Sequence, residues 1–466
     1  MSSRLFTSNF IKVCFANFFL FFTLYLCLPI TPFESAADLS SQGYAGWQLY
    51  FSFVVGLLIG GPFHNYIIEH HSRKRIIFLT YLSIVLPVLV VSYTTLASVY
   101  FLALFAQGAA FGLATATTIT IAIDVTVPAK RDKGNLIYAW AGRLGMILGL
   151  PLSIYIYTAY SYQEIIYATL GAGFLALISL LSTRHPFRAP LQSQALSLDR
   201  FILPRGWKMI VIMIAVSFIP GSLFPLFMES WDIKSITKLS DVLVFMILPF
   251  VVFLVSAVLS RIEIDSMLHH RGLGYLLIRL PLPLIAAYLL YHYQQEMSFG
   301  SLLISAWLLV GLVFSVATAL APHRIYPKIN KWVLESQYRV EVTSPIFSGL
   351  LCILLALLLE HDLELTGFDS YLIVSQLLVF GLARVSSPVF LLLILSSKHC
   401  ERGTANTSQH LAWEVGLALG ASTSLALGLS LADCLYLGIA LVVLSMLIYT
   451  HIRYRLHKIA KHKHLS

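Results

Sequence analysis

The sequence predicts an all-α integral membrane protein with 14 spans: two six-helix parallel repeats and two additional central transmembrane helices. Three observations lead to this fold class. Charged residues make up only 11% of the chain, against roughly 25% in soluble domains. Apolar runs recur along the whole chain, and many approach the length of about 20 residues that a helix needs to cross a bilayer. Finally, one apolar segment marked by polar residues occurs twice.

Fourteen candidate spans follow one another along the chain. They lie near residues 10–30, 46–68, 76–95, 99–124, 136–159, 163–182, 207–229, 241–260, 273–292, 298–321, 344–360, 370–397, 407–429 and 433–451. Outside the spans, every Lys and Arg falls on the side that holds both termini, except Lys234 and Lys238. Because basic loops stay in the cytoplasm, we expect cytoplasmic termini and a location in a plasma membrane, such as the bacterial inner membrane.

The repeated segment reads QGAAFGLATATT at 107–118 and QLLVFGLARVSS at 376–387. Further along, with a shift of 271 positions, the matches are Arg131 with Arg402, Asn135 with Asn406, Gly145 with Gly416, and Gly149 with Gly420. Spans four and five therefore recur as spans twelve and thirteen. The even number of intervening spans gives both copies the same orientation, as in parallel repeats. Chance similarity among apolar helices is the alternative.

The repeats divide the chain into five parts. These are an N-terminal six-helix bundle (1–183), a cytoplasmic linker (184–206), two central helices (207–262), a C-terminal six-helix bundle (263–452) and a basic cytoplasmic tail (453–466). The net charge of +9 favours contact with anionic membrane lipids over nucleic-acid binding. The five cysteines are scattered without a CxxC pair, so we expect neither a metal site nor a cofactor. A monomer is the expected state.

Several motifs resemble those of the major facilitator superfamily, particularly its fourteen-helix drug/proton antiporter branch. The loop GGPFHNYIIEHHSRKR keeps the glycine and the basic end of a family signature, with Asn65 in place of an acid. Gln107 and Gly108 match a helix-four signature, but Leu104 replaces its arginine, so the proton role of that arginine does not transfer. GRLGMILGLPLS partly keeps the antiporter glycine pattern. The resemblance implies transport by alternating access.

Charged residues inside spans are the strongest candidates for function, because each costs about 2.5–3.5 kcal/mol on insertion scales. Arg384 lies near the middle of span twelve and Arg143 lies in span five. Arg384 binds substrate or couples transport, or it is paired structurally. Arg143 takes part in coupling, or it extends its charged group to the cytoplasmic surface. Glu414 occupies the repeat position of Arg143. Because arginine keeps its proton, Glu414 is the candidate proton site, or else a fixed countercharge. Asp124 is expected in an ion pair, either at the cytoplasmic gate or at the end of its helix.

Polar and small residues in the spans complete the candidate site. Gln107, Gln376 and Asn17 offer both donors and acceptors, either to a solute in a central cavity or to neighbouring helices. Glycines spaced by three or four allow close helix packing, either as plain packing or as a pliable interface. The interface candidates are Gly142, Gly145, Gly149, Pro151, Gly416 and Gly420.

Together these features predict a secondary active transporter rather than an enzyme. The chain has no GxxxxGK[ST] motif, which argues against ATP-driven transport. The resemblance favours proton-coupled efflux of small organic molecules. Three arginines inside predicted spans (Arg143, Arg279 and Arg384) against one deep glutamate favour ion-coupled uptake or exchange of an organic anion instead. A membrane-embedded transferase or a lipid flippase is the alternative of another class.

Overall fold

The computed structural model describes residues 5–71, 73–127, 130–183, 201–230, 247–260, 343–363, 368–397 and 401–463, with isolated residues between 284 and 308. The described part is helical. It holds eight helices long and apolar enough to cross a membrane, together with the shorter apolar helices Trp47–Phe63, Ile247–Ser260 and Ile346–Glu360. The predicted class of an all-helical membrane protein is therefore confirmed. Several predicted features lie mostly or wholly outside the described residues. These are the spans 273–292 and 298–321, the linker 184–206, and the basic residues Lys234, Lys238 and Arg279.

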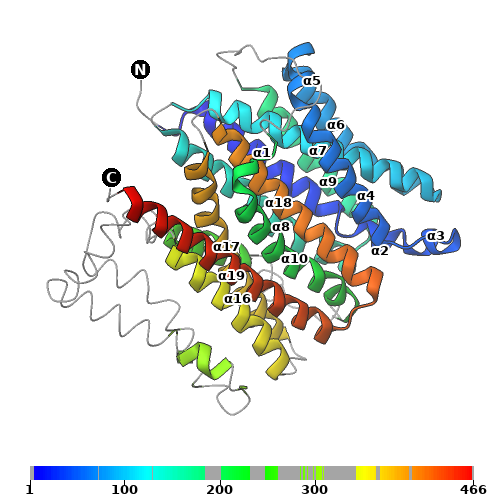
Figure 1. The fold of residues 1–466 in the computed structure, drawn as a ribbon. Helices are drawn as coiled ribbons and strands as arrows, with labels where there is room; N and C mark the ends of the chain where they lie inside the picture. Colours follow the sequence, from blue (N-terminus) through cyan, green and yellow to red (C-terminus); the bar gives the residue numbers. More distant parts are fainter. Residues whose placement is uncertain are drawn as a thin grey trace. The chain divides into compact units, whose positions relative to one another are not determined.

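The chain divides into two compact units. The first comprises Met1–Phe250 with Leu393–Leu431, and the second comprises Val251–Leu392 with Ala432–Ser466. The helices of the first unit are α1 (Ser8–Cys27), α2 (Thr31–Glu34), α3 (Ala36–Ser41), α4 (Trp47–Gly60), η1 (Gly61–Phe63), α5 (His64–His70), α6 (Arg73–Tyr93), α7 (Ala97–Asp124), α8 (Arg131–Ala159), α9 (Tyr162–Leu181), η3 (Pro204–Gly206), α10 (Trp207–Ser230) and α18 (Arg402–Leu427). Figure 1 labels most of them. The first unit thus combines the N-terminal helices with α18 from near the end of the sequence.

Local sequence sets several helix ends in this unit. The Thr7 hydroxyl accepts a hydrogen bond from the Phe10 amide, 3.3 Å away, and so caps the start of α1. At the other end of the sequence, α18 stops at Gly428, whose φ of 56° is left-handed. Glycine adopts this conformation without the steric penalty of a side chain, which makes it a common helix terminator.

Glycines bring the helices of the first unit into backbone contact. α1 packs along α8, where a side chain at Gly145 or Gly149 would press on the carbonyl groups of Phe18 and Phe22. α4 packs along α7 in the same manner, through glycines on both helices. In a bilayer such close contact supplies van der Waals packing that larger side chains would prevent.

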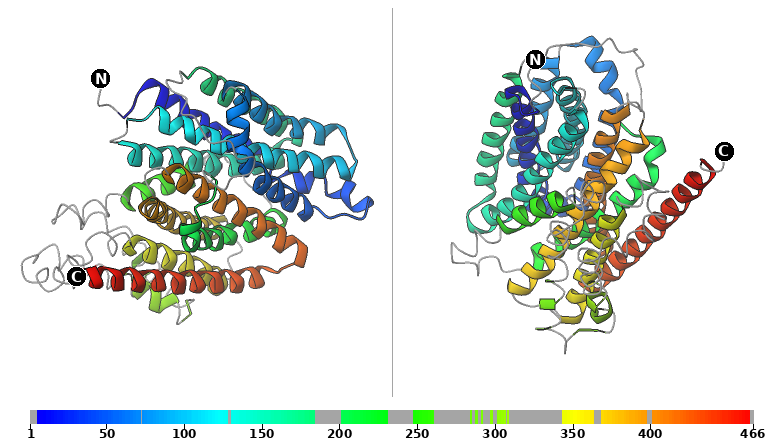
Figure 2. Two further views of the ribbon diagram at one scale, coloured as in Figure 1. Left: turned by 45° about the horizontal axis from the view of Figure 1, so that its top comes forward. Right: turned by 90° about the vertical axis from the view of Figure 1, so that its left-hand side faces the viewer.

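The same arrangement joins α10 to α18, which lie side by side in the green and orange parts of the ribbon (Figure 1, Figure 2). A side chain at Gly416 would overlap Ser217 and Ile214, and one at Gly420 would overlap the Phe218 carbonyl. α18 also contacts α4, where the Ser422 hydroxyl donates to the Trp47 carbonyl over 2.8 Å. α18 is therefore held between α10 and the N-terminal helices.

The segment that leads into α10 is anchored in the same unit. Phe201 is only 2% exposed, and a side chain at Gly61 would overlap its ring. The Leu203 amide donates to the Ser408 hydroxyl on α18 over 2.8 Å. The described end of the predicted linker is therefore packed against both α18 and the end of α4.

The second unit contains α16 (Thr343–Leu363), α17 (Phe368–Ser396) as far as Leu392, α19 (Leu431–Lys463) from Ala432, and most of the helix Ile247–Ser260. Figure 2 shows α19 as one long helix. Gly349 on α16 faces the Gly381 carbonyl on α17, so these two helices approach closely. The Ser256 hydroxyl donates to the Phe380 carbonyl over 2.8 Å, which ties Ile247–Ser260 to α17.

Candidate functional site

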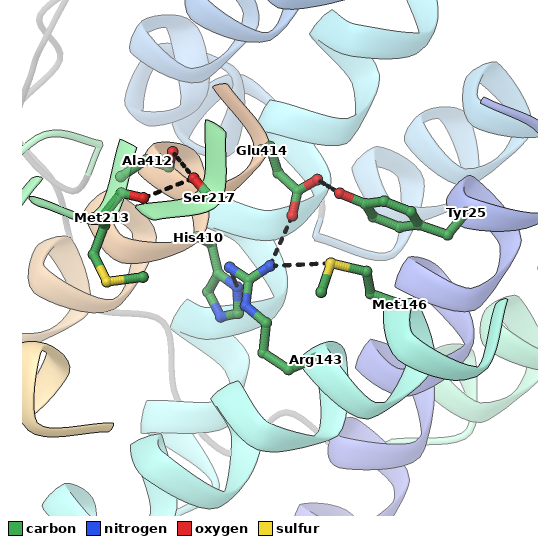
Figure 3. A network of polar contacts seen from close by, with 8 residues as sticks. All are labelled: Tyr25, Arg143, Met146, Met213, Ser217, His410, Ala412 and Glu414. Atoms are coloured by element: carbon green, nitrogen blue, oxygen red, sulfur yellow. Dashed lines mark hydrogen bonds and ion pairs between the residues drawn. The ribbon is translucent and has the colours of Figure 1, made fainter. Parts of the chain in front are cut away.

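A buried ion pair joins α8 to α18 inside the first unit. Arg143 Nη1 lies 2.9 Å from Glu414 Oε1, and the two side chains are only 4% and 2% exposed. Figure 3 shows the guanidinium group pointing from α8 toward the carboxylate. Two charges so far from water require each other, since removing one leaves the other uncompensated. Arg143 and Glu414, the two candidates for coupling, therefore form one buried ion pair.

The other neighbours of Arg143 are a methionine sulfur and aromatic rings. Nη2 lies 3.1 Å from His410 Nδ1, and Nη1 lies 3.8 Å from the Met146 sulfur (Figure 3). The guanidinium carbon is 4.4 Å from the centre of the Trp413 ring and 5.4 Å from that of Phe21. Aromatic faces attract a cation through their quadrupole, most strongly when water is absent. They therefore stabilise the charge of Arg143 without neutralising it.

The second carboxylate oxygen of Glu414 is also engaged. The Tyr25 hydroxyl of α1 donates to Glu414 Oε2 (Figure 3). Glu414 thus accepts hydrogen bonds from α1 and from α8 while it is carried by α18. A change in the protonation of this one carboxyl group would alter contacts among three helices.

Hydrogen-bond bookkeeping assigns the tautomer of His410. The guanidinium group of Arg143 can only donate, so His410 Nδ1 must accept and the ring proton must sit on Nε2. His410 Nε2 is buried and has no partner among the described residues. The same holds for Trp413 Nε1 on the same helix. The site therefore contains two N–H donors without an acceptor in the described part of the chain.

A second contact joins the same two helices. The Asn406 side-chain amide donates to the Asn135 carbonyl over 3.4 Å. Asn135 and Asn406 occupy matching positions of the repeated segments, and so do Arg143 and Glu414. Two pairs of matching positions are thus in direct contact.

Three other predicted site residues lie in the first unit. Gln107 is buried on α7, and its amide nitrogen donates to the Ile84 carbonyl over 2.9 Å and lies 3.5 Å from the Cys27 sulfur. Asn17 donates to the Tyr138 carbonyl over 2.8 Å, while its Oδ1 has no partner among the described residues. These amides bridge helices in this structure. Asp124 is the last residue of α7.

The two remaining binding candidates lie in the second unit, on α17. Arg384 is 3% exposed, and its Nε donates to the Ser348 hydroxyl over 2.9 Å. The Gln376 amide nitrogen lies 3.4 Å from the Ser375 hydroxyl oxygen. Their roles in substrate binding, like that of Gln107, remain predictions.

The predicted interface residues take part in helix packing. Gly142 faces the Asn17 amide and the Phe21 ring, one turn before Gly145 on the same face of α8. Gly145, Gly149, Gly416 and Gly420 lie at the contacts of α8 with α1 and of α18 with α10. Pro151 lies inside α8 without ending it.

Sequence reasoning missed three members of the site. Tyr25, His410 and Trp413 were not singled out, although His410 lies one helical turn before Glu414 and so shares its face. That spacing was an available signal. Tyr25 had none, because only the fold brings α1 next to α18. A second buried carboxyl group, Glu360 on α16, was missed as well.

Comparison with known proteins agrees with this arrangement. The sequence matches the Major Facilitator Superfamily over residues 13–331, so the chain belongs to this family. It is a multi-pass membrane protein and a secondary transporter rather than an enzyme. No curated protein matches the sequence.

Solved structures that align with TM-scores above 0.5 show the same fold at low sequence identity. A bacterial homologue of the iron transporter ferroportin, in an outward-facing state with soaked iron, aligns with a TM-score of 0.52 and 14% identity, over 95% of this chain and 98% of that one. The POT family transporter PepTSo aligns with a TM-score of 0.51 and 12% identity, over 96% and 98%. The human organic anion transporter MFSD10 aligns with a TM-score of 0.42 and 16% identity, over 95% and 99%.

Proposed function

We propose that this chain is a proton-coupled secondary transporter in which Glu414 is the proton site and Arg143 its fixed countercharge. The observation that carries the proposal is the buried pair between α8 and α18, at 2.9 Å. Intramembrane charges are costly, and those that pair with one another mark proton relays or substrate paths. Of the two partners only the carboxyl group can gain and lose a proton in the physiological range, because arginine stays charged.

Protonation of Glu414 would change how strongly α18 is held. A hydrogen bond between charged groups contributes about 1.5–3 kcal/mol, more than a neutral one. Loss of the ionic contact to Arg143 would therefore shift the balance between paired and separated helices by about 10- to 150-fold. A ligand moves a conformational equilibrium only by its differential affinity for the two states. In the proposed cycle, the lost contact between Arg143 and Glu414 supplies the differential affinity of the proton.

The same proposal covers the finer topology. The distribution of Lys and Arg favours a plasma-membrane protein with cytoplasmic termini. The resemblance favours proton-driven export of small organic molecules, and a monomer is the proposed working form. Uptake or exchange of an organic anion is the second candidate. It is favoured by the concentration of N–H donors around Arg143.

For the architecture, we propose that α10 is the counterpart of α1 in the second repeat. α10 packs along α18 at Gly416 and Gly420, the matching positions of Gly145 and Gly149, where α1 packs along α8. The sequence instead placed 207–262 as two added central helices. The check is a superposition in an experimental structure. α10 with α18 should overlay α1 with α8, and a better fit of the 273–292 segment onto α1 would overturn the assignment.

Infrared difference spectroscopy tests the proton site without a known substrate. We expect the purified full-length protein to show a carboxyl C=O band that appears on acidification and is missing in Glu414→Gln. Asp124→Asn is the matched control, because it removes an acid at the end of α7 and leaves the pair intact. A band that survives Glu414→Gln unchanged would remove Glu414 as the proton site.

Transport measurements then test coupling. Proteoliposomes with an imposed pH gradient are offered ethidium, as an organic cation, and p-toluenesulfonate, as an anion that stays charged at every pH used. The parent chain should move one of them with the gradient, and Glu414→Gln should exchange solute without responding to it. A gradient response retained in Glu414→Gln would refute the coupling role.

A further inference from the structure

The proposed proton site has a second property, which concerns the substrate. We propose that Arg143, His410 Nε2 and Trp413 Nε1 bind the anionic group of an aromatic organic anion, and that this anion binds together with the proton on Glu414. The inference rests on the proposed function for the same site and names the class of substrate.

The first argument is the balance of donors and acceptors. Arg143 only donates, and its acceptors here are Glu414, the His410 Nδ1 atom and the Met146 sulfur. His410 Nε2 and Trp413 Nε1 add two buried donors without a partner among the described residues. Buried donors in folded proteins are nearly always satisfied. A ligand with several oxygen acceptors and no donor of its own, such as a carboxylate or a sulfonate, satisfies this set.

The donors also lie close together. His410 and Trp413 are three residues apart on α18, so they lie on one face of the helix. Arg143 contacts both, one through a hydrogen bond and the other over its ring. One buried acceptor without a described partner, Asn17 Oδ1, belongs to a side chain that lies with the Phe21 ring next to Gly142. That acceptor would suit a hydroxyl group on the ligand.

The second argument is the aromatic surroundings. The Phe21 ring lies 5.1 Å from the Phe111 ring and 5.2 Å from the His410 ring, centre to centre. Tyr138 adds an edge-on contact to His410 at 6.3 Å. An anion held by Arg143 would place its body among these rings, where a flat aromatic group makes offset or edge-on contacts. An aliphatic or strongly polar body gains less.

The third argument is charge. The groups that face Glu414 are Arg143 from α8 and Tyr25 from α1, with His410 on its own helix, while α10 presents Ser217 beside Ala412. In the ion pair, the Glu414 carboxylate is the anion that neutralises Arg143. Protonated Glu414 leaves the arginine uncompensated, and a substrate anion restores neutrality. Proton and anion therefore favour each other's binding, and this coupling is reciprocal. They would cross the membrane in the same direction, so the inference supports the second candidate function, uptake of an organic anion, over proton-driven export.

Binding of p-toluenesulfonate to the purified full-length protein, measured by calorimetry at pH 5.5 and pH 8, tests the inference. We expect binding to be at least about tenfold tighter at the lower pH, as a coupling of this size implies. The neutral p-toluenesulfonamide, the aliphatic methanesulfonate and the cation phenyltrimethylammonium should bind weakly or not at all. A sulfonamide that binds as tightly as the sulfonate would overturn the anion site, and an equal methanesulfonate would overturn its aromatic part.

Variants separate this inference from the proposed function. His410→Phe and Trp413→Phe keep a ring but remove one donor each, and should weaken sulfonate binding by about tenfold. Trp207→Phe is the matched control, because Trp207 is exposed at the start of α10. Glu414→Gln should bind sulfonate equally well at both pH values. Donor effects without any pH dependence in the parent chain would overturn the joint binding of proton and anion. A pH-dependent carboxyl band without sulfonate binding would overturn the anion site and leave the proton site standing.

Discussion

The free energy that couples Arg143 to Glu414 can be measured by a double-mutant cycle. Arg143→Met and Glu414→Leu each leave one charge buried without its partner, which typically destabilises a protein by about 3–5 kcal/mol. The double variant has no buried charge at this position. Replacing a whole buried pair by apolar residues is often neutral or stabilising. We therefore expect a coupling of at least about 3 kcal/mol between the two sites.

The structure also predicts that the two single variants differ. Glu414→Leu leaves the Tyr25 hydroxyl without its acceptor, which adds about 1–3 kcal/mol. Arg143 retains only His410 Nδ1 and the Met146 sulfur among its described acceptors, and it cannot lose its proton. In Arg143→Met the unpaired carboxylate can become neutral by taking up a proton. Glu414→Leu should therefore be the more damaging change.

The sign of the pH dependence follows from the same asymmetry. Acidification neutralises the unpaired carboxylate in Arg143→Met, so the cost of that substitution should fall as the pH falls. The unfolding free energy of Glu414→Leu itself should lack this response, because the arginine it leaves behind does not titrate. Reversible unfolding in mixed micelles with increasing sodium dodecyl sulfate, at pH 5.5 and pH 8, measures both. Additive single effects, or equal pH responses of the two variants, would refute the reasoning.

Four further substitutions test helix packing and capping. Gly145→Val should separate α1 from α8 and lower the unfolding midpoint, since even a Cβ there overlaps the Phe18 carbonyl, whereas Gly171→Ala faces open space and should stabilise α9 by about 0.5–1 kcal/mol. Phe201→Ala removes a buried ring and should lower the unfolding free energy by about 3–5 kcal/mol; an unchanged value would show that the segment is not packed in the membrane protein. Thr7→Ala removes the cap of α1 and should cost about 1 kcal/mol by the same assay, with Thr7→Ser as the neutral control.

The class of the protein and its charged site residues were accessible from the sequence. Long apolar runs and few charges can only be reconciled with a helical membrane protein, and an arginine and a glutamate inside spans are costly enough to stand out. The sequence also placed Arg143 and Glu414 at matching positions. It did not show that they touch, because contacts between helices far apart in sequence depend on packing rather than on local pattern.

The aromatic residues of the site were beyond sequence reasoning for a different reason. Aromatic residues make up 13% of the chain, so Phe21 and Trp413 do not stand out from the many that face lipid or other helices. Amide side chains posed the opposite problem. Gln107 stood out as a polar residue in a span, yet its amide nitrogen donates to the Ile84 carbonyl, a contact that leaves no mark on sequence spacing.

The contacts between matching positions explain why this pair suits a coupling role. In a protein built from two parallel repeats, a residue lies near its own counterpart only if both are close to the axis that relates the repeats. Arg143 with Glu414 and Asn135 with Asn406 both meet this condition, so α8 and α18 would run beside that axis. In the proposed transport cycle, the relative motion of the two halves would be centred there. A charge placed off the axis would sense one half only, whereas a carboxyl group on it, bonded to α1 and α8 and carried by α18, is sensitive to both.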